Sequence, residues 1–377
     1  MDAKTFAEFF AGIGLVREGL TPGGWRCVYA NDLSVTKHSF YRARFGAEDH
    51  FHLEDVGYTD RIVDRIQGSP FLATASFPCT DLSLAGRYEG LSGKHSSAFY
   101  AFADVLEKLG EQKPQVVMLE NVPGLLSSRK GKDFEFVARK LADLGYWVDA
   151  MIVDASHFLP QSRPRVFIFG IQNPPPSWRG EDGRFYPPNK TISHAKKTVK
   201  LSTGWLYIPE KSERRSDVPK LHELIDVFDD GDWTDAKIEL SASRIPEQHK
   251  VCLDKLYDRG TIWAGTAFQR TRHGRQVVEV RFDGLAGCLR TPKGGNGRQI
   301  VIIIEPSRTA IRWMKPIEYA RLQGAPDYPL VGSTTQQLFA FADAVCVPVI
   351  KWLDDNILTP AYEWASKDET VLEIPRA

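Results

Sequence analysis

The stretch Phe71-Leu72-Ala73-Thr74-Ala75-Ser76-Phe77-Pro78-Cys79 leads an apolar run into a cysteine. The run is typical of a buried strand, and Pro78 should end it because proline has no N–H to donate to a sheet. Cys79 then lies on a loop at the carboxyl end of a strand, where ligands gather in open α/β sheets. A cysteine there is a candidate nucleophile, although a free cysteine is more often a small buried apolar residue.

Other strand ends in the chain also carry polar side chains. The apolar run Gln115–Leu119 predicts a buried strand, and Glu120 follows it directly. The alternative for Glu120 is an acid at the start of a helix. A later strand, Val166–Gly170, is preceded by Arg163 and Arg165. Arg165 is the better candidate for a partly buried planar donor because it is adjacent to the strand.

The N-terminal region has the layout of a nucleotide-binding unit. Thr5–Phe10 predicts a strand, and a Gly12-Ile13-Gly14 turn leads into a helix that begins at Leu15. Glycines permit such a tight turn, and the helix N–H groups then face an anionic group. The turn has the form GxG and not GxGxxG, so a plain turn stays an alternative.

Two acidic residues follow at further strand ends. The strand Trp25–Ala30 runs into Asp32, which is placed to hold ribose hydroxyls or to cap the next helix. Asp55, followed by Val56, could accept from an adenine amino group or be an ordinary loop acid. Strands that alternate with helical patterns in this way are typical of an open α/β sheet.

The composition and length are those of an ordinary globular protein with one large domain or two unequal domains. It has 377 residues, of which 42% are hydrophobic and 25% charged, and its net charge is zero. Its longest aliphatic run, Ile300–Ile304, is too short to span a membrane, and no secretory signal is evident. Five scattered cysteines form no CxxC pair, so we expect no disulfide framework, no metal site and a reducing, cytoplasmic location.

The region from about residue 173 is rich in proline, glycine and charge, and predicts a second domain of short, irregular strands. Residues 267–300 contain seven basic and two acidic residues. Such a run is either a solvated face or a surface for a phosphate chain, and the glycines of 294–297 favour the second. The loop 80–97 has the glycines and cations of a mobile segment that closes over a polyanion.

Five motifs, taken together and in order, resemble those of the DNA (cytosine-5)-methyltransferases over nearly the whole chain. They are Phe10-Ala11-Gly12-Ile13-Gly14, Pro78-Cys79, Glu120-Asn121-Val122, Gln161-Ser162-Arg163-Pro164-Arg165 and Arg321-Leu322-Gln323-Gly324-Ala325-Pro326-Asp327. The resemblance implies an α/β fold: a Rossmann-like catalytic domain with a mostly parallel, doubly wound sheet that binds S-adenosylmethionine, a smaller, irregular target-recognition domain, and a DNA cleft between them. We expect the limits 1–172, 173–310 and 311–377, with the last segment returning to the catalytic domain.

The resemblance also assigns residues to roles. The catalytic residues it implies are Cys79, Glu120, Arg165 and Arg163. The cofactor-binding residues are Phe10, Ala11, Gly12, Ile13, Gly14, Asp32, Leu33, Asp55, Val56, Pro78, Ala98, Asp343 and Val345. The DNA-binding residues, chosen also from the basic run and the loop 80–97, are Ser83, Arg87, Arg163, Arg270, Arg272, Arg290 and Lys293.

The chain departs from the family pattern at three places. Leu15 stands where a second glycine is common. The closing motif is usually Gly-Asn-Ser-Val and here reads Ala342-Asp343-Ala344-Val345, which makes Asp343 an altered contact for the methionine end of the cofactor. A common Thr-Leu pair of the recognition domain appears as Cys288-Leu289.

The implied function is methylation of C5 of a cytosine flipped out of double-stranded DNA, in a monomer without membrane contact. A compact enzyme of this kind resembles bacterial or phage enzymes that protect host DNA in restriction-modification or related anti-phage systems. Two alternatives stay open. One branch of the family methylates transfer RNA and carries Cys-Phe-Thr, a signature that no cysteine of this chain has. The other is a catalytically silent relative that binds DNA.

Overall fold

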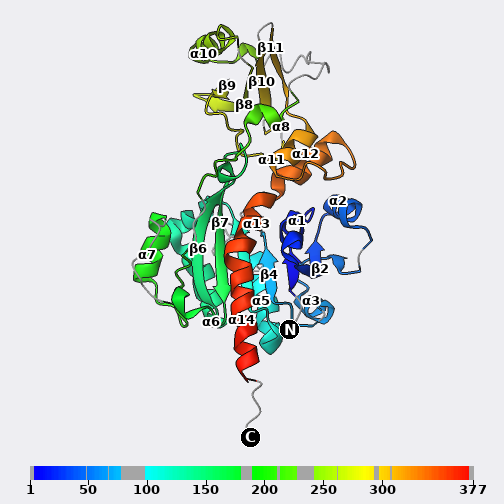
Figure 1. The fold of residues 1–377 in the computed structure, drawn as a ribbon, viewed down its shortest axis with the longest axis vertical. Coiled ribbons are helices and arrows are strands. Elements are labelled where there is room, and N and C mark those ends of the chain that lie inside the picture. Colours follow the sequence, from blue (N-terminus) through cyan, green and yellow to red (C-terminus); the bar gives the residue numbers. More distant parts are fainter. Residues whose placement is uncertain are drawn as a thin grey trace.

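The chain folds into a large lobe and a small lobe, each built on its own sheet (Figure 1). The structure, a computed structural model, describes residues 4–47, 49–66, 68–77, 98–179, 189–209, 213–226, 242–260, 262–292, 297–305 and 308–372. The large lobe holds seven strands in the order β3-β2-β1-β4-β5-β7-β6, and the small lobe holds β11-β10-β8-β9. The predicted fold class, a mostly parallel doubly wound sheet with a smaller irregular domain, is confirmed.

The strands of the large sheet bring their functional ends to one edge. Their bounds are β1 Thr5–Phe9, β2 Arg26–Asp32, β3 Phe51–Leu53, β4 Leu72–Ala75, β5 Val116–Asn121, β6 Trp147–Asp154 and β7 Pro164–Ile171. The pairs β1–β2, β1–β4, β2–β3 and β4–β5 are parallel, whereas β7 is antiparallel to β5 and β6. The start of β7 therefore lies at the same edge as the carboxyl ends of β1, β4 and β5.

Alternate residues of each strand bury against helices on opposite faces of the large sheet. Leu72 belongs to one apolar cluster with α1 and α13, and Ala73 to another with α5 and α6. Helices cover both faces of the sheet, which explains why these strands are continuous apolar runs in the sequence and do not alternate between apolar and polar residues. The helices here are α1 Leu15–Leu20, α2 Val35–Phe45, α3 Thr59–Arg65, α5 Ala98–Leu109, α6 Lys132–Asp143 and α13 Val347–Leu353.

The small lobe is an antiparallel sheet with its own core. It consists of β8 Trp263–Arg272, β9 Arg275–Arg281, β10 Ile300–Glu305 and β11 Arg308–Trp313. A two-residue turn at His273-Gly274 has positive φ at both positions, 49° and 77°, and joins β8 to β9 as a tight hairpin. The even residues of the Ile300–Ile304 run pack in this lobe with Leu253 of α10 Glu247–Tyr257, while Val301 and Ile303 join the first large cluster.

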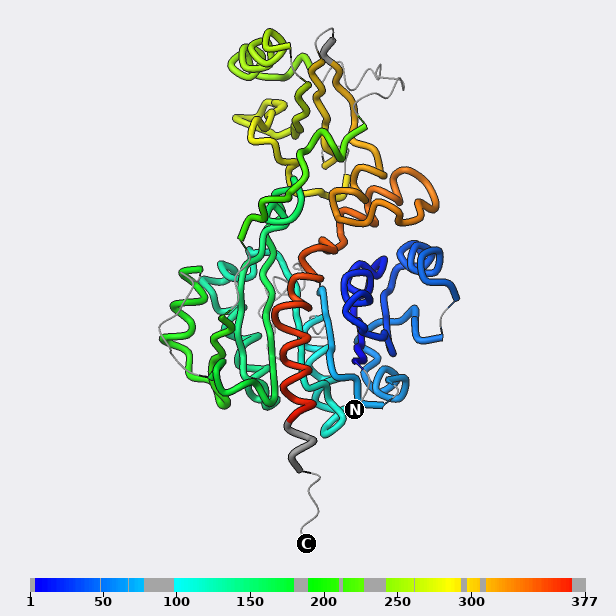
Figure 2. Tube along the Cα trace, in the orientation of Figure 1, coloured from blue at the N-terminus to red at the C-terminus, as the bar shows by residue number. Residues whose placement is uncertain are grey.

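The stretch between the two sheets packs on the large lobe before the chain crosses over. In α7, Lys190–Thr198, the buried residues Ile192 and Ala195 join the second cluster of the large sheet. The ring of Trp205 lies 6.2 Å from that of Phe134 in α6. The chain then passes α8, Leu221–Leu224, on its way to the small lobe (Figure 2). The domain limits at residues 172 and 310 stay a proposal, since residues 189–208 lie against the large sheet.

The C-terminal segment returns to the large lobe, as the resemblance implies. After β11 the chain forms α11 Pro316–Leu322 and α12 Thr334–Asp343, then α13 and α14 Thr359–Leu372, which run down the large lobe in red in Figures 1 and 2. Asp354 accepts a hydrogen bond from Trp25 Nε1 at 2.7 Å, and Tyr362 packs edge-on against the same tryptophan. No helix formed by the described residues is long and apolar enough to cross a membrane.

A buried ion pair fixes the small sheet to the returning segment, and breaking it should destabilise the fold. Arg312 of β11 donates to both oxygens of Glu318 in α11, with side chains 8% and 0% exposed. Arg312→Leu leaves the buried carboxylate without its cation, so we expect a loss of about 3 kcal/mol or more in the free energy of unfolding.

Urea denaturation measures this loss. Lys351→Met, which breaks an exposed pair with Asp355, is the matched control and should cost less than about 1 kcal/mol. Equal effects of the two substitutions would contradict the role of the buried pair.

Candidate active site

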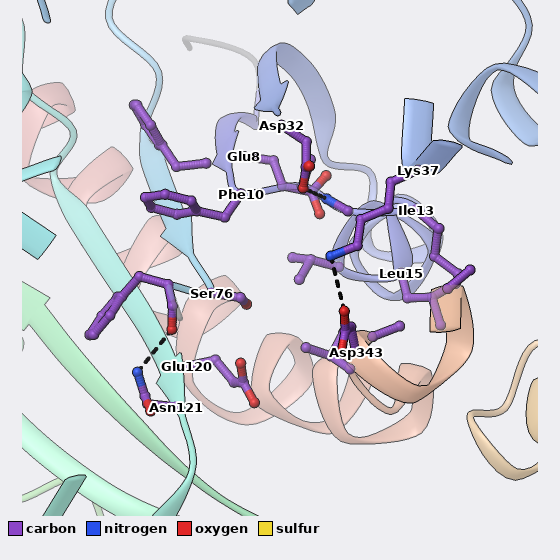
Figure 3. A pocket seen from close by; sticks show the side chains of 18 of the residues that line it. Glu8, Phe10, Ile13, Leu15, Asp32, Lys37, Ser76, Glu120, Asn121 and Asp343 are labelled. Carbon is purple, nitrogen blue, oxygen red and sulfur yellow. Dashed lines mark hydrogen bonds and ion pairs between the residues drawn. The ribbon is translucent and has the colours of Figure 1, made fainter. Parts of the chain in front are cut away.

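A cavity of about 450 Å³ opens at the edge of the large sheet where the strand ends meet (Figure 3). Its volume lies within the usual range for small-molecule sites, about 300–1,000 Å³. The lining comes from the turn after β1, the end of β2, the residues after β4, the end of β5, the start of β7 and the end of α12. Segments far apart in the sequence therefore share one pocket.

The turn after β1 is a run of left-handed backbone that forms one wall of the pocket. Phe10, Gly12 and Gly14 have φ of 56°, 60° and 80°. A side chain at Gly14 would place its Cβ 2.6 Å from the ring of Phe45, so the close packing of α2 requires glycine there. Phe10, Ala11, Gly12 and Ile13 line the cavity, whereas Gly14 supports the turn from behind.

Asp32 connects the end of β2 to the glycine turn. Its Oδ2 accepts from the N–H of Gly12 at 2.9 Å, and its Oδ1 accepts from the N–H of Ser34 at 2.8 Å. The helix cap that was the alternative for Asp32 is supplied by Ser34, whose Oγ accepts from the N–H of Lys37. A carboxylate has about four acceptor positions, so Asp32 can still accept from a ribose hydroxyl in the pocket. Leu33 also lines the cavity and is 67% exposed.

Glu8 is a buried carboxyl group in the pocket wall that the motif analysis did not identify. It is 1% exposed, and neither of its carboxylate oxygens has a hydrogen-bond partner. Burial raises the pKa of Glu8 to about 8, with Asp32 adding to the rise and Arg17 opposing it. Glu8 is thus largely protonated at neutral pH. The signal in the sequence was a charged residue inside the apolar strand Thr5–Phe9.

Glu120 and Arg165, predicted from separate strands, form an ion pair at the opposite wall. Arg165 Nε lies 3.0 Å from Glu120 Oε1, and both side chains are about one-seventh exposed. Arg165 Nη1 also donates to the carbonyl of Pro164 at 2.9 Å. The pair therefore places a carboxylate and a planar guanidinium donor together at one wall of the cavity. β5 extends to Asn121 and β7 begins at Pro164, so both residues belong to strands and not to loops.

Asn121 holds the chain that leads to the predicted nucleophile. Its Nδ2 donates to the carbonyl of Phe77 at 3.0 Å, which fixes the end of the β4 segment beside Glu120. Ser76 and Phe77 line the cavity. Pro78 and Cys79 lie outside the described residues, as do Ser83 and Arg87. The last described residues before the predicted cysteine therefore line this pocket.

Arg163 is buried, and its hydrogen bonds connect three segments of the chain. It is 2% exposed, and it donates to the carbonyls of Leu289 at 3.3 Å and Ala342 at 2.9 Å and also to that of Ala344. Burial, and then the charge of Arg165, lower the pKa of Arg163 to about 10, so it stays protonated at neutral pH. The geometry favours a supporting role over the DNA contact predicted for Arg163.

Cys288 stands at the junction between the pocket and the small lobe. Its Sγ lies 3.6 Å from Arg163 Nη1, and 3.9 and 3.8 Å from Arg165 Nη1 and Nη2. The thiol thus occupies the position of the usual threonine and contacts both arginines.

The closing motif forms the remaining wall. Ala342, Asp343 and Val345 line the cavity, and Asp343 Oδ2 lies 3.3 Å from Lys37 Nζ of α2 (Figure 3). Lys37 was not among the predicted residues. Nothing in the local sequence links two positions so far apart.

Besides Gly14, three predicted cofactor residues are not among the described residues that line the cavity. Asp55 is exposed, and its Oδ1 accepts from the N–H of Gly57 at 2.8 Å, as in an ordinary loop. Val56 is buried in the second apolar cluster. Ala98 begins α5 and packs against that cluster. Their predicted role in cofactor binding stays a proposal.

A second hollow of about 630 Å³ lies on the small lobe next to the pocket. Arg270, Arg272 and Arg290 line it, together with Cys288 and Ser162. Glu279 pairs with Arg270 at 3.1 Å and with Arg272 at 2.6 Å. The predicted basic surface is therefore partly neutralised, whereas Arg290 lies over the ring of Phe268. Lys293 lies outside the described residues.

Comparison with known proteins assigns this architecture to a family. The chain matches the family described as C-5 cytosine-specific DNA methylase over residues 4–359. It therefore belongs to this family and is a DNA (cytosine-5-)-methyltransferase. The family resemblance carried by the five motifs is confirmed.

Individual relatives match along nearly the whole chain. The Type II methyltransferase M.HpaII of Haemophilus parainfluenzae is 27% identical over 379 residues, covering 94% of this chain and 89% of that relative. The Type II methyltransferase M.HhaI of Haemophilus parahaemolyticus is 24% identical, covering 93% of both chains. The crystal structure of the S. pombe Dnmt2 methyltransferase has a TM-score of 0.61 and 18% identity, covers 94% of this chain and 98% of that one, and shows the shared fold.

The buried Glu8 makes stability depend on pH. Its ordinary pKa is 4.5 and its pKa in the folded protein is about 8, so between these values only the folded state holds the proton. The free energy of unfolding should fall as pH rises through this window, by up to about 1.4 kcal/mol per pH unit from this group. Glu8→Gln, which stays neutral, should flatten the fall.

Denaturant unfolding at pH 6, 7 and 8 measures the slope. Glu363→Gln, at an exposed position of α14, is the control and should keep the wild-type slope. A Glu8→Gln protein with the same slope as wild type would show that Glu8 does not carry the proton.

Proposed function

We propose that this enzyme uses S-adenosylmethionine to methylate C5 of a cytosine flipped from double-stranded DNA at a specific sequence. The observation that carries the proposal is the Glu120–Arg165 pair, placed in the pocket beside the segment that leads to Cys79. An acid and a planar donor in this position match the edge of a cytosine ring. The glycine turn and Asp32 provide a second subsite in the same pocket.

The residues present fit S-adenosylmethionine. The cavity has room for a ligand of that size, Asp32 can accept from ribose hydroxyls, and Phe10 offers an aromatic surface. The Glu8 carboxyl, buried without a partner, is an unused acceptor or donor in the wall. When bound, this cofactor supplies an electrophilic methyl group on a sulfonium. Phe10, Gly12, Asp32, Leu33, Asp343 and Val345 would hold it.

The chain's own residues activate the base. C5 of cytosine is a poor nucleophile, and addition of the Cys79 thiolate to C6 makes C5 electron-rich. Glu120 donates to N3, and Arg165 donates to O2, so that both stabilise the charge that develops on the ring. After methylation at C5, a base removes the C5 proton, the C6–S bond breaks, and Cys79 returns as a thiolate.

The DNA path follows from the position of the pocket. A target carbon inside a duplex is inaccessible, so the base must leave the helix at a cost of roughly a few kcal/mol. The hollow of the small lobe lies next to the catalytic pocket and carries Arg270, Arg272 and Arg290. We assign it to the duplex, with Ser83, Arg87 and Lys293 as further contacts from the loop segments.

The biological role we propose is protection of host DNA in a restriction-modification or related anti-phage system, by a cytoplasmic monomer. The support is that M.HpaII and M.HhaI, which match over nearly the whole chain, are named Type II methyltransferases. Bisulfite sequencing of DNA from cells that express the protein would identify the methylated cytosine. Methyl transfer from labelled cofactor to transfer RNA and not to duplex DNA, or to neither, would contradict the proposed function.

Replacement of the nucleophile should separate chemistry from binding. Cys79→Ala removes the thiolate that adds to C6, so we expect methyl transfer to be abolished while duplex binding persists. Filter binding and incorporation of labelled methyl groups measure the two properties. Cys252→Ala, at an exposed cysteine of α10, is the control and should retain full activity. Full activity of purified Cys79→Ala would refute the mechanism.

Replacement of the acid should slow the reaction without loosening the cofactor. Glu120→Gln keeps the shape of the side chain but cannot give N3 a proton, so transfer should slow by roughly 100-fold or more. Affinity for S-adenosylhomocysteine, measured by calorimetry, should stay within about twofold of wild type, a free-energy change under roughly 0.4 kcal/mol. A normal rate with weakened cofactor binding would place Glu120 in the cofactor subsite instead.

A further inference from the structure

The Lys37–Asp343 pair lies across the wall of the cofactor pocket, where α2 meets α12 (Figure 3). Lys37 Nζ is 3.3 Å from Asp343 Oδ2, and the side chains are 27% and 46% exposed. The stem of Lys37 lies over the glycine turn, with its Cδ 3.9 Å from where a Cβ on Gly12 would be. The ammonium group is thereby held above the turn that forms the pocket wall.

This pair is poorly placed to stabilise the fold. Lys37 is in the first turn of α2 and Asp343 is the last residue of α12, so each charge opposes the dipole of its own helix. Exposed ion pairs contribute little to stability. The contact between α2 and α12 is also made by Phe40 and Phe341, whose rings lie 6.3 Å apart. Stability therefore gives no reason for two opposite charges at this position.

The charged residues that line the pocket leave one cation available for an anionic group of a ligand. Among the described residues that line it, the cations are Lys37, Arg163 and Arg165. Arg163 is bound to backbone carbonyls and Arg165 to Glu120. Lys37 is the cation that remains for an anionic group of a ligand, and Asp343 is beside it for a cationic one. Two opposite charges 3.3 Å apart are complementary to a zwitterion.

We propose that Lys37 is a cofactor-binding residue that recognises the α-carboxylate of the amino-acid end of the cofactor, with Asp343 receiving the α-ammonium group. The inference rests on the proposed use of S-adenosylmethionine. In the free protein the two side chains neutralise each other across the pocket. Binding of the zwitterion replaces their single ion pair with two. The aspartate in the closing motif is thus matched by a lysine elsewhere in the chain.

Two ligands that differ in the amino-acid end test this assignment without catalysis. S-adenosylhomocysteine has the zwitterion, and 5′-methylthioadenosine has the same nucleoside without it. By calorimetry on the purified full chain, Lys37→Met should weaken S-adenosylhomocysteine binding roughly tenfold, because a charge-assisted contact is lost at a partly exposed site. Asp343→Asn should weaken it in the same direction. Neither substitution should change the affinity for 5′-methylthioadenosine.

Controls separate the assignment from damage to the fold. Lys37→Arg keeps the positive charge and should retain most of the affinity, and Lys351→Met, remote from the pocket, should match wild type. Unchanged S-adenosylhomocysteine binding in Lys37→Met, equal weakening of both ligands, or tighter binding in Asp343→Asn would each overturn the assignment. Wild-type protein that binds neither ligand would contradict the proposed cofactor itself, which is a different result.

Discussion

The buried guanidinium of Arg163 is the contact on which the site depends. Burying a cation is costly unless hydrogen bonds compensate it, and Arg163, which is 2% exposed, donates through its Nη groups to carbonyls from two distant parts of the chain, while its Nε has no partner among the described residues. One part, Leu289, lies between β9 and β10 of the small sheet, and the other, Ala342, belongs to the closing motif. These hydrogen bonds connect the segments of Leu289 and Ala342 to the start of β7, next to Arg165. The walls of the cofactor pocket and the position of the small lobe thus depend on one side chain.

The sheet edge that Arg163 stabilises explains why much of the site could be predicted from sequence. Parallel strands place their carboxyl ends together, so a polar residue after an apolar run has a predictable neighbourhood. Asp32 and Glu120 were found in this way, and Arg165 was predicted because it lies next to the apolar strand that begins at Val166. The glycine turn could be predicted because the backbone at Gly14 requires glycine: its φ is positive and there is no room for a side chain. The doubly wound fold was predicted from the family resemblance, and it agrees with the continuous apolar runs, which are typical of buried parallel strands.

Other parts of the site depend on side-chain contacts that no local pattern encodes. Lys37 and Asp343 meet only because α12 returns to pack on α2. Glu8 is visible in the sequence as a charged residue within an apolar strand, but its place in the pocket wall follows only from the fold. Asp55 was predicted from its place after a strand, and its carboxylate is exposed beyond the short edge strand β3, so its part in cofactor binding stays a proposal. Residues 189–208 have an irregular composition yet pack on the large sheet, so the predicted start of the small domain at residue 173 stays a proposal as well.

In the proposed mechanism, the Cys79 thiolate adds to cytosine while Glu120 and Arg165 hold the ring. Duplex DNA in which the target cytosine carries fluorine at C5 tests this addition, because the fluorine cannot be removed as a proton is. With S-adenosylmethionine present, we expect a complex that survives denaturing electrophoresis, and peptide mapping should place the adduct on Cys79. A denaturant-stable adduct on another cysteine, or methylation of normal DNA with no trapped complex on the fluorinated duplex, would contradict the account.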